Sequence, residues 1–168
     1  MQTNEHSDGA AAASGSRQVL TFSLGGEIYG VDILRVKEIR GWSPVTRIPH
    51  STPAVLGVLN LRGAIVPIID LRVRFALRAA EFTPVTVIIV LSLRTEDGQR
   101  ECGIVVDSVK DVADISPQDI RPAPSLNAGD TSEFIEGITT CDEKMLILLE
   151  ADRLVARDLA PAGMASAA

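Results

Sequence analysis

Alternating hydrophobic and polar residues over 18–24 form the first strong pattern in the chain and predict a β-strand. Glycines at 25 and 26 interrupt the alternation, which resumes over 27–31. Two such runs separated by two glycines are typical of a β-hairpin. We therefore expect the folded part of the chain to begin with a hairpin.

A second pair of apolar runs, within 57–72, predicts a central hairpin. Its strands are rich in Leu, Val and Ile and flank the break Asn60-Leu61-Arg62-Gly63. Both runs are apolar on both faces, which indicates burial on both sides, and Pro67 predicts an edge position or a bulge. A buried hairpin needs no arginine at its tip. Arg62 is therefore expected to pair with an acid, to be exposed for a partner, or both.

Short helical turns and further strands fill the rest of the chain. Asp32 is placed to cap one helical turn before a strand over 36–42, and Leu71 and Phe75 share one face of a second helical turn over 70–75. The second half predicts strands at 85–91, 101–107 and 109–115, a last hairpin at 134–140 and 145–149, and a short helix at 150–157.

Many short strands at regular spacing predict an all-β fold with short helical turns. Each half of the chain has enough strands for one small barrel, and the second strand-rich half begins at about residue 85. No sequence repeat is strong enough to indicate a duplication. Small and polar residues predict a disordered leader over 1–16, a folded domain over 17–157 and a flexible tail over 158–168.

The composition narrows the class of protein. A chain of 168 residues predicts one domain or two very small ones. Its net charge of -6 argues against a general nucleic-acid binder. No apolar stretch reaches the length of a membrane span, and the first residues lack the apolar core of a secretory signal.

No catalytic or metal-binding set emerges from the residues. His50 stands alone, and Cys102 and Cys141 are far apart in the sequence, so free thiols in a reducing cytoplasm are favoured over a disulfide or a metal site. Asp70 and Asp107 each end a predicted strand. We interpret them as solvated strand ends or helix caps in preference to a pair of catalytic carboxylates.

One charged set near the middle of the chain stands out. If 36–42 is a strand, Val36, Glu38 and Arg40 share one face. Glu38 is then the nearest good counter-ion for Arg62 in a compact barrel. Such a pair, partly exposed, contributes roughly 0–1 kcal/mol, and a structural role and an interface role are equally open at this point.

Several separated motifs resemble the CheW family of bacterial chemotaxis coupling proteins. The first is the run Tyr29-Gly30-Val31-Asp32-Ile33-Leu34-Arg35-Val36-Lys37-Glu38-Ile39-Arg40-Gly41, and the second is the stretch from Gly57 to Arg72. The runs at 102–107, at 120–124 and at 145–149 resemble the second half of that family. The resemblance covers about residues 17 to 157, nearly the whole predicted fold.

The resemblance implies two intertwined SH3-like five-stranded β-barrel subdomains around a shared hydrophobic core, with a short C-terminal helix. It implies a non-catalytic cytoplasmic adaptor, without cofactor or metal, recruited to receptor arrays at the inner face of the membrane. Such proteins couple the cytoplasmic tip of chemoreceptors (methyl-accepting chemotaxis proteins) to the regulatory domain of the histidine kinase CheA. No nucleic acid and no direct membrane insertion are expected.

The resemblance also implies two sets of binding residues. A groove between the barrels is expected to bind the receptor, and a loop over 120–126 is expected to bind the kinase. Mapped onto this sequence, the receptor set is Val36, Glu38, Ile39, Gly57, Arg62, Val87 and Val112, and the kinase set is Ile120 and Leu126. Gly57 is expected to allow close backbone approach of the partner, so that Gly57→Asp or Arg62→His weakens receptor binding and leaves folding largely intact.

Other functions remain open at this level. The chain is also compatible with a coupling module of a related chemosensory pathway that does not control swimming, or with a structural scaffold that has no kinase partner. A module fused to a phosphoryl-receiver domain is disfavoured, because the sequence ends near Ala168. A small thiol enzyme with Cys102 as nucleophile is the least favoured alternative.

Overall fold

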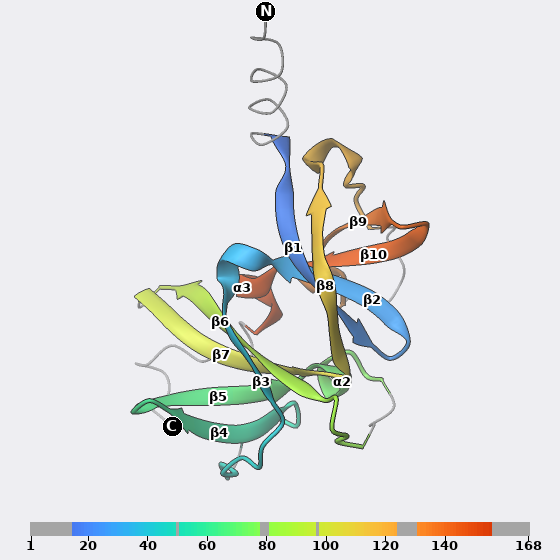
Figure 1. Cartoon of the computed structure of the whole chain (residues 1–168). Helices are drawn as coiled ribbons and strands as arrows, with labels where there is room; N and C mark the ends of the chain where they lie inside the picture. Colours follow the sequence, from blue (N-terminus) through green and yellow to red (C-terminus); the bar gives the residue numbers. More distant parts are fainter. Residues whose placement is uncertain (1–14, 50, 78–80, 97, 124–130, 156–168) are drawn as a thin grey trace, which may run out of the picture.

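The structure, a computed structural model, describes residues 15–49, 51–77, 81–96, 98–123 and 131–155. The strands in these residues are short and are joined by tight turns and single helical turns (Figure 1). The strands are β1 (Arg17–Leu24), β2 (Glu27–Asp32), β3 (Val36–Gly41), β4 (Val55–Leu61), β5 (Ala64–Asp70), β6 (Val87–Thr95), β7 (Gly98–Val106), β8 (Ser108–Ile115), β9 (Ile135–Cys141) and β10 (Lys144–Leu149). The helical turns are η1 (Ile33–Arg35), α2 (Leu71–Arg74), η2 (Pro117–Asp119), η3 (Thr131–Phe134) and α3 (Ala151–Leu154).

The strands form two five-stranded sheets, which confirms the predicted fold class. Sheet A has the order β8-β1-β2-β10-β9, and sheet B has the order β3-β6-β7-β5-β4. Each sheet contains one parallel pair, β2 with β10 in sheet A and β5 with β7 in sheet B, and its other pairs are antiparallel. The leader and the tail predicted from composition lie almost entirely outside the described residues, as does the end of the C-terminal helix.

The two sheets are built from two equivalent units that exchange their hairpins. The first unit is the hairpin β1–β2 followed by β3, β4, β5 and α2; the second is the hairpin β6–β7 followed by β8, β9, β10 and α3. In each sheet the hairpin of one unit pairs with the three strands of the other unit. The second unit begins near the predicted boundary at residue 85, but each sheet takes strands from both units.

The same backbone bridge closes each sheet. The segment after β3 reaches β4 through Thr46, whose backbone pairs with Val58, and the segment after β8 reaches β9 through Arg121, whose backbone pairs with Ile138. In both cases a glycine precedes the bridged residue on the receiving strand, Gly57 in β4 and Gly137 in β9. These bridges bring the two edge strands of each sheet toward one another, as in a small barrel.

A shared hydrophobic core joins the sheets. The fully buried side chains of Phe22 and Leu24 in β1 belong to the same cluster as those of Ile89 and Leu91 in β6, so the predicted shared core is present. One face of each hairpin turns toward the other hairpin across the molecule, and the continuous apolar runs of β6 and β7 are buried on both faces. Two smaller clusters lie within the individual sheets.

The central hairpin is less buried than predicted. β4 is an edge strand of sheet B and is mostly half-buried, and Ile65 at the start of β5 is 64% exposed. Of the two alternatives predicted for Pro67, the edge position is wrong, because β5 lies inside the sheet, whereas the hairpin does contain a register shift next to it, between Val55 and Gly57 of β4. Pro67 fits there because Val58, opposite it, exchanges both backbone hydrogen bonds with Thr46 and needs none from residue 67. The parallel ladder to β7 begins only at Ile68.

Two predicted helix caps are present. The Asp32 carboxylate accepts the backbone N–H of Leu34 at the start of η1, and the Asp70 carboxylate accepts the N–H of Arg72 at the start of α2. A carboxylate in this position satisfies one of the free donors of the first turn. Each cap lies where a strand ends and the chain turns back.

Candidate protein-binding site

The predicted ion pair between Glu38 and Arg62 is present at the edge of sheet B. Arg62 Nη1 donates to Glu38 Oε1 at 2.9 Å. Arg62 occupies the tip of the β4–β5 hairpin with φ 54°, and the tip is braced by the Asn60 side chain, which accepts the N–H of Gly63. The Arg62 side chain is 82% exposed, whereas that of Glu38 is 24% exposed. The carboxylate is thus held in place while the guanidinium keeps free donors toward solvent.

A second arginine lies close to the same carboxylate. Arg40 Nη1 is 3.8 Å from Glu38 Oε2. One carboxylate therefore faces two guanidinium groups, so this patch carries excess positive charge on a chain that is negative overall. The arrangement suits a partner that presents a carboxylate.

The space beside Gly57 is filled by the backbone of Thr46 from the same chain. The φ of Gly57 is +152°, which disfavours side chains, and a Cβ placed there would lie 2.2 Å from the backbone oxygen of Thr46. The close approach that the glycine permits is the bridge that closes sheet B. The expectation that Gly57→Asp leaves folding largely intact is therefore wrong.

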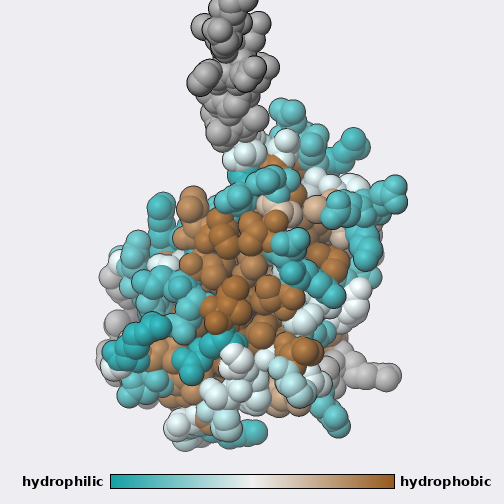
Figure 2. Space-filling view, in the orientation of Figure 1, coloured by the Kyte–Doolittle hydropathy of each residue, from teal (hydrophilic) through white to brown (hydrophobic). Residues whose placement is uncertain are grey.

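The apolar residues of the predicted receptor set come from both sheets. Ile39 on β3 is 44% exposed and Val112 on β8 is 45% exposed, while Val36 and Val87 are half-buried. Figure 2 shows a hydrophobic area over the middle of the face where β3 and β8 lie in Figure 1. An exposed apolar area of this kind on a small domain is typical of a protein-binding surface.

β3 and β8 correspond residue by residue. Each begins with one register shift against its partner hairpin, so that Val36-Lys37-Glu38-Ile39 matches Val109-Lys110-Asp111-Val112. Ile39 and Val112 are thus equivalent positions in the two units. The two most exposed apolar residues of the set are related by the internal repeat of the fold.

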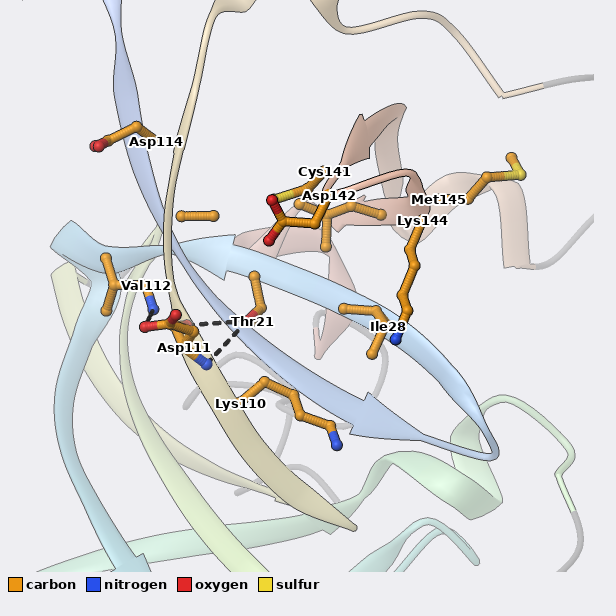
Figure 3. A pocket seen from close by; sticks show the side chains of 12 residues that line it. Thr21, Ile28, Lys110, Asp111, Val112, Asp114, Cys141, Asp142, Lys144 and Met145 are labelled. Carbon is orange, nitrogen blue, oxygen red and sulfur yellow. Dashed lines mark hydrogen bonds between the residues drawn. The ribbon is translucent and has the colours of Figure 1, made fainter.

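The position equivalent to the ion pair is a hollow in sheet A (Figure 3). Asp111 stands where sheet B has Glu38, and the β9–β10 tip carries Asp142, with φ 51°, where sheet B has Arg62. Two carboxylates cannot form the equivalent ion pair. A pocket of about 470 Å³ lies between them. Its lining residues are Thr21, Ile28, Lys110, Asp111, Val112, Ala113, Asp114, Cys141, Asp142, Lys144, Met145 and Leu146.

The predicted kinase residues are only partly described. Ile120 follows η2 and packs half-buried against a cluster of sheet A that includes Leu146 and Leu148. Gly137 allows this packing, because a Cβ there would lie 2.4 Å from the Ile120 side chain. Leu126 lies outside the described residues.

Comparison with known proteins decides the family. The family model for the CheW-like domain matches residues 18–159. The chain belongs to the CheW family. It is 46% identical over 142 residues to the chemotaxis protein CheW of Klebsiella aerogenes, covering 84% of this chain and 83% of that protein. It is 33% identical to that of Bacillus subtilis over 84% of this chain and 88% of the relative.

A solved structure supports the same assignment. The crystal structure of the scaffolding protein TtCheW from Thermoanaerobacter tengcongensis matches with a TM-score of 0.75 and 33% identity, covering 83% of this chain and 88% of that one. The chain is accordingly a chemotaxis coupling adaptor of the CheW type. Among the described residues, no helix is long and apolar enough to cross a membrane, and no group of metal-binding side chains is found.

The structure contains a buried ion cluster that the sequence did not predict. Arg72 is 2% exposed, and its Nε and Nη2 donate to Asp70 Oδ1 and Oδ2, each at 3.0 Å. Its Nη1 lies 3.6 Å from Asp107 Oδ1, and its guanidinium lies over the ring of Phe82, 5.0 Å from the centroid. Asp70 is thus a helix cap as expected, but it is buried. The only signal for this cluster in the sequence was the presence of Asp70, Arg72 and Arg74 close together at the end of the hairpin.

Neither described cysteine is expected to act as an activated nucleophile. Cys102 is fully buried, and burial together with the charges of Asp142 and Asp111 raises the pKa of the Cys141 thiol. A raised pKa leaves less thiolate near neutral pH. We expect iodoacetamide at about pH 7.5 to alkylate Cys141 in the native protein more slowly than it alkylates free cysteine, as followed by mass spectrometry. Faster alkylation at either cysteine would favour the thiol-enzyme alternative.

Proposed function

We propose that this chain couples the cytoplasmic tip of chemoreceptors to the regulatory domain of the histidine kinase CheA. The family assignment supports an adaptor role, and the similar proteins are named as chemotaxis and scaffolding proteins. The observation that carries the proposal is the edge of sheet B at β3, where Glu38 holds the exposed guanidinium of Arg62 and the next residue, Ile39, is an exposed apolar side chain. The protein would work in the cytoplasm, in receptor arrays at the inner face of the membrane.

The proposed receptor surface suits a helical partner. A helix presents apolar side chains at intervals of three and four residues, and it packs well into an apolar groove with charged groups at its rim. Ile39 from sheet B and Val112 from sheet A would contact the helix, with Val36 and Val87 forming the half-buried floor. Arg62 at the rim would bind a receptor carboxylate. Gly57 would support this surface indirectly, by closing sheet B behind it.

We propose that the kinase surface is separate from the receptor surface. Ile120 packs on sheet A only, and the second expected kinase residue, Leu126, lies outside the described residues. Separate surfaces would let the adaptor hold receptor and kinase at the same time. This separation is what a coupling protein requires.

Reconstitution tests the proposal. Receptor fragments in nanodiscs, the purified kinase and this protein are combined, and kinase autophosphorylation is measured with and without the adaptor. Strong activation only when all three are present is the expected result. Kinase activity that is indifferent to the adaptor would rule out coupling to CheA, and a response with receptors of only a non-swimming pathway would assign the chain to that pathway.

Loss of the Arg62 guanidinium is expected to weaken receptor binding without unfolding the protein. Arg62→Ala removes an exposed ion pair, so the free energy of unfolding should fall by less than about 1 kcal/mol, while receptor affinity should fall about tenfold. Isothermal calorimetry measures the affinity, and urea denaturation measures the stability. Arg94→Ala, at an exposed arginine on β6, is the matched control.

Glu38→Gln separates two roles of Arg62. If Arg62 binds the receptor directly, Glu38→Gln keeps most of the affinity, because the arginine remains available. If Arg62 only braces the groove through Glu38, both variants lose affinity equally. Unchanged affinity in Arg62→Ala would exclude both roles and the proposed surface with them.

A further inference from the structure

The chain passes between the two sheets at two crossovers, and both are held by ion pairs. The first crossover leaves sheet A after β2 and enters sheet B at β3 through η1; the second leaves sheet B after β7 and enters sheet A at β8 through Asp107. Each crossover carries one charged residue that pairs with a short helix. The pairs are Arg35 with Asp152 of α3, and Asp107 with Arg72 of α2.

The pair at Asp107 joins three parts of the molecule. Asp107 Oδ1 faces Arg72 Nη1 at 3.6 Å, and its Oδ2 accepts the backbone N–H of Gly25 at 2.9 Å. Its own N–H donates to the carbonyl of Ser23 at 3.1 Å. Arg72 belongs to sheet B through β5 and α2, whereas Ser23 and Gly25 belong to the β1–β2 hairpin of sheet A. Asp107 therefore fastens the hairpin of sheet A to the helix of sheet B.

The pair at Arg35 makes the same connection with the charges reversed. Arg35 Nη2 donates to Asp152 Oδ2 at 2.8 Å, and Asp152 Oδ1 accepts the backbone N–H of Arg94 at 2.9 Å. Arg35 Nη1 also lies 3.4 Å from the carbonyl oxygen of Ser92. Ser92 and Arg94 on β6 are equivalent to Ser23 and Gly25 at the end of β1, as the matching registers show. Arg72 and Asp152 are thus equivalent in the repeat, each being the second residue of its helix. Asp107 and Arg35 are one position apart, because the register that matches Val36 to Val109 matches Arg35 to Ser108.

We infer that these two ion pairs, which we call the crossover clamps, are positioning devices that fix the orientation of sheet A relative to sheet B. The shared core between the sheets is apolar, and apolar contacts are not directional. The hydrogen bond from Arg35 to Asp152 and the hydrogen bond from the Gly25 N–H to Asp107 each involve a charged group and have a preferred geometry, so they favour one packing over its neighbours. The 3.6 Å contact between Asp107 and Arg72 adds an ion pair without a hydrogen bond. The clamps would therefore fix the relative orientation of the two sheets, which the apolar core alone does not fix.

The groove depends on this orientation. Arg35 directly precedes β3, which carries Ile39, and Asp107 directly precedes β8, which carries Val112. Each clamp therefore lies at the start of a strand that carries one side of the groove. This part of the inference rests on the proposed receptor surface. The kinase residue Ile120 lies on sheet A alone and is independent of the orientation.

Two isosteric substitutions remove the charges of the clamps and keep the fold. Asp107→Asn retains an oxygen for Gly25 and places an amide donor against Arg72, and Asp152→Asn retains an oxygen for Arg94 and places a donor against Arg35. Glu136→Gln is the matched control, because Glu136 pairs with Arg17 within sheet A. Backbone amide residual dipolar couplings are measured for the full chain in each variant.

In the wild type and in Glu136→Gln, one alignment tensor should fit both sheets. In the double variant Asp107→Asn with Asp152→Asn, the sheets should require separate tensors, while each sheet alone still fits well. One common tensor for the double variant, equal to that of the wild type, overturns the inference. This readout does not depend on any partner, so it decides the inference even where the proposed function fails.

Binding provides the second readout. Receptor affinity of the double variant should fall by about 3- to 30-fold, and its affinity for the isolated CheA regulatory domain should match the wild type. A role in stability alone would lower both affinities together through the folded fraction, and that result would overturn the positioning role. Separate tensors combined with wild-type receptor affinity would overturn the claim that the clamps set the groove.

Discussion

Gly57→Ala is expected to destabilise the protein by about 3 kcal/mol or more, from backbone strain and a clash with the chain. The new Cβ would lie 2.2 Å from the carbonyl oxygen of Thr46 and 2.7 Å from its carbonyl carbon, and φ is +152°. Relief would require the segment around Thr46 to move away and break the bridge to Val58. Urea denaturation followed by circular dichroism measures the change.

Two other glycines separate strain from steric clash. Gly63 has φ +89°, and an added Cβ there would meet nothing within 4 Å, so Gly63→Ala should show the cost of strain alone, about 1 kcal/mol. Gly41 has no positive φ and open space, so Gly41→Ala should leave stability nearly unchanged. If Gly57→Ala is as stable as Gly41→Ala, the bridge does not close sheet B in solution.

Arg72→Met is the second substitution with a large expected effect. It leaves the Asp70 carboxylate buried without its two charged hydrogen bonds, and stranding one partner of a buried pair costs about 3–5 kcal/mol. The methionine fills most of the volume, so a cavity adds little. Guanidinium denaturation should show a lower midpoint with an unchanged slope.

A second substitution should recover part of this loss. Asp70→Asn in the Arg72→Met background removes the stranded charge and keeps an acceptor for the helix cap, so the double variant should be more stable than Arg72→Met alone. Lys37→Met is the matched control, because Lys37 and Glu101 form an exposed pair at 3.4 Å. Its expected cost is less than about 1 kcal/mol. If Lys37→Met and Arg72→Met lower the free energy of unfolding equally, burial of the Asp70–Arg72 pair does not increase the cost of breaking it.

Local patterns in the sequence were sufficient for the elements and for the Glu38–Arg62 pair. The pair could be predicted because alternation placed Glu38 on one face of its strand, and because a charged residue at the tip of an apolar hairpin requires a counter-ion or exposure to solvent. The cap at Asp70 could be predicted for similar local reasons. Its burial could not, because burial is decided by the strands that pack over it from the other unit.

The exchange of hairpins was not predictable from strand spacing. Two barrels, each from one half, and two barrels with exchanged hairpins have the same order of strands along the chain. The repeat itself left one short trace, the match of Val36-Lys37-Glu38-Ile39 with Val109-Lys110-Asp111-Val112. The local sequence does not show that Thr46 lies against Gly57, because the bridge to Val58 brings the two together. Gly57 was therefore interpreted as a contact to a partner. Neither clamp could be inferred, since each joins residues of different units.

The exchanged hairpins also set the order in which a growing chain can fold. Sheet B needs only β3 to β7, and these strands follow one another along the chain, so it can form as soon as β7 has left the ribosome. The first hairpin, β1–β2, is synthesised earliest but pairs with β8 and with β10, where Leu146 lies beside Ile28. Both backbone edges of this hairpin therefore stay unpaired until β8 and β10 have been made. During synthesis this hairpin is the segment most in need of protection from aggregation.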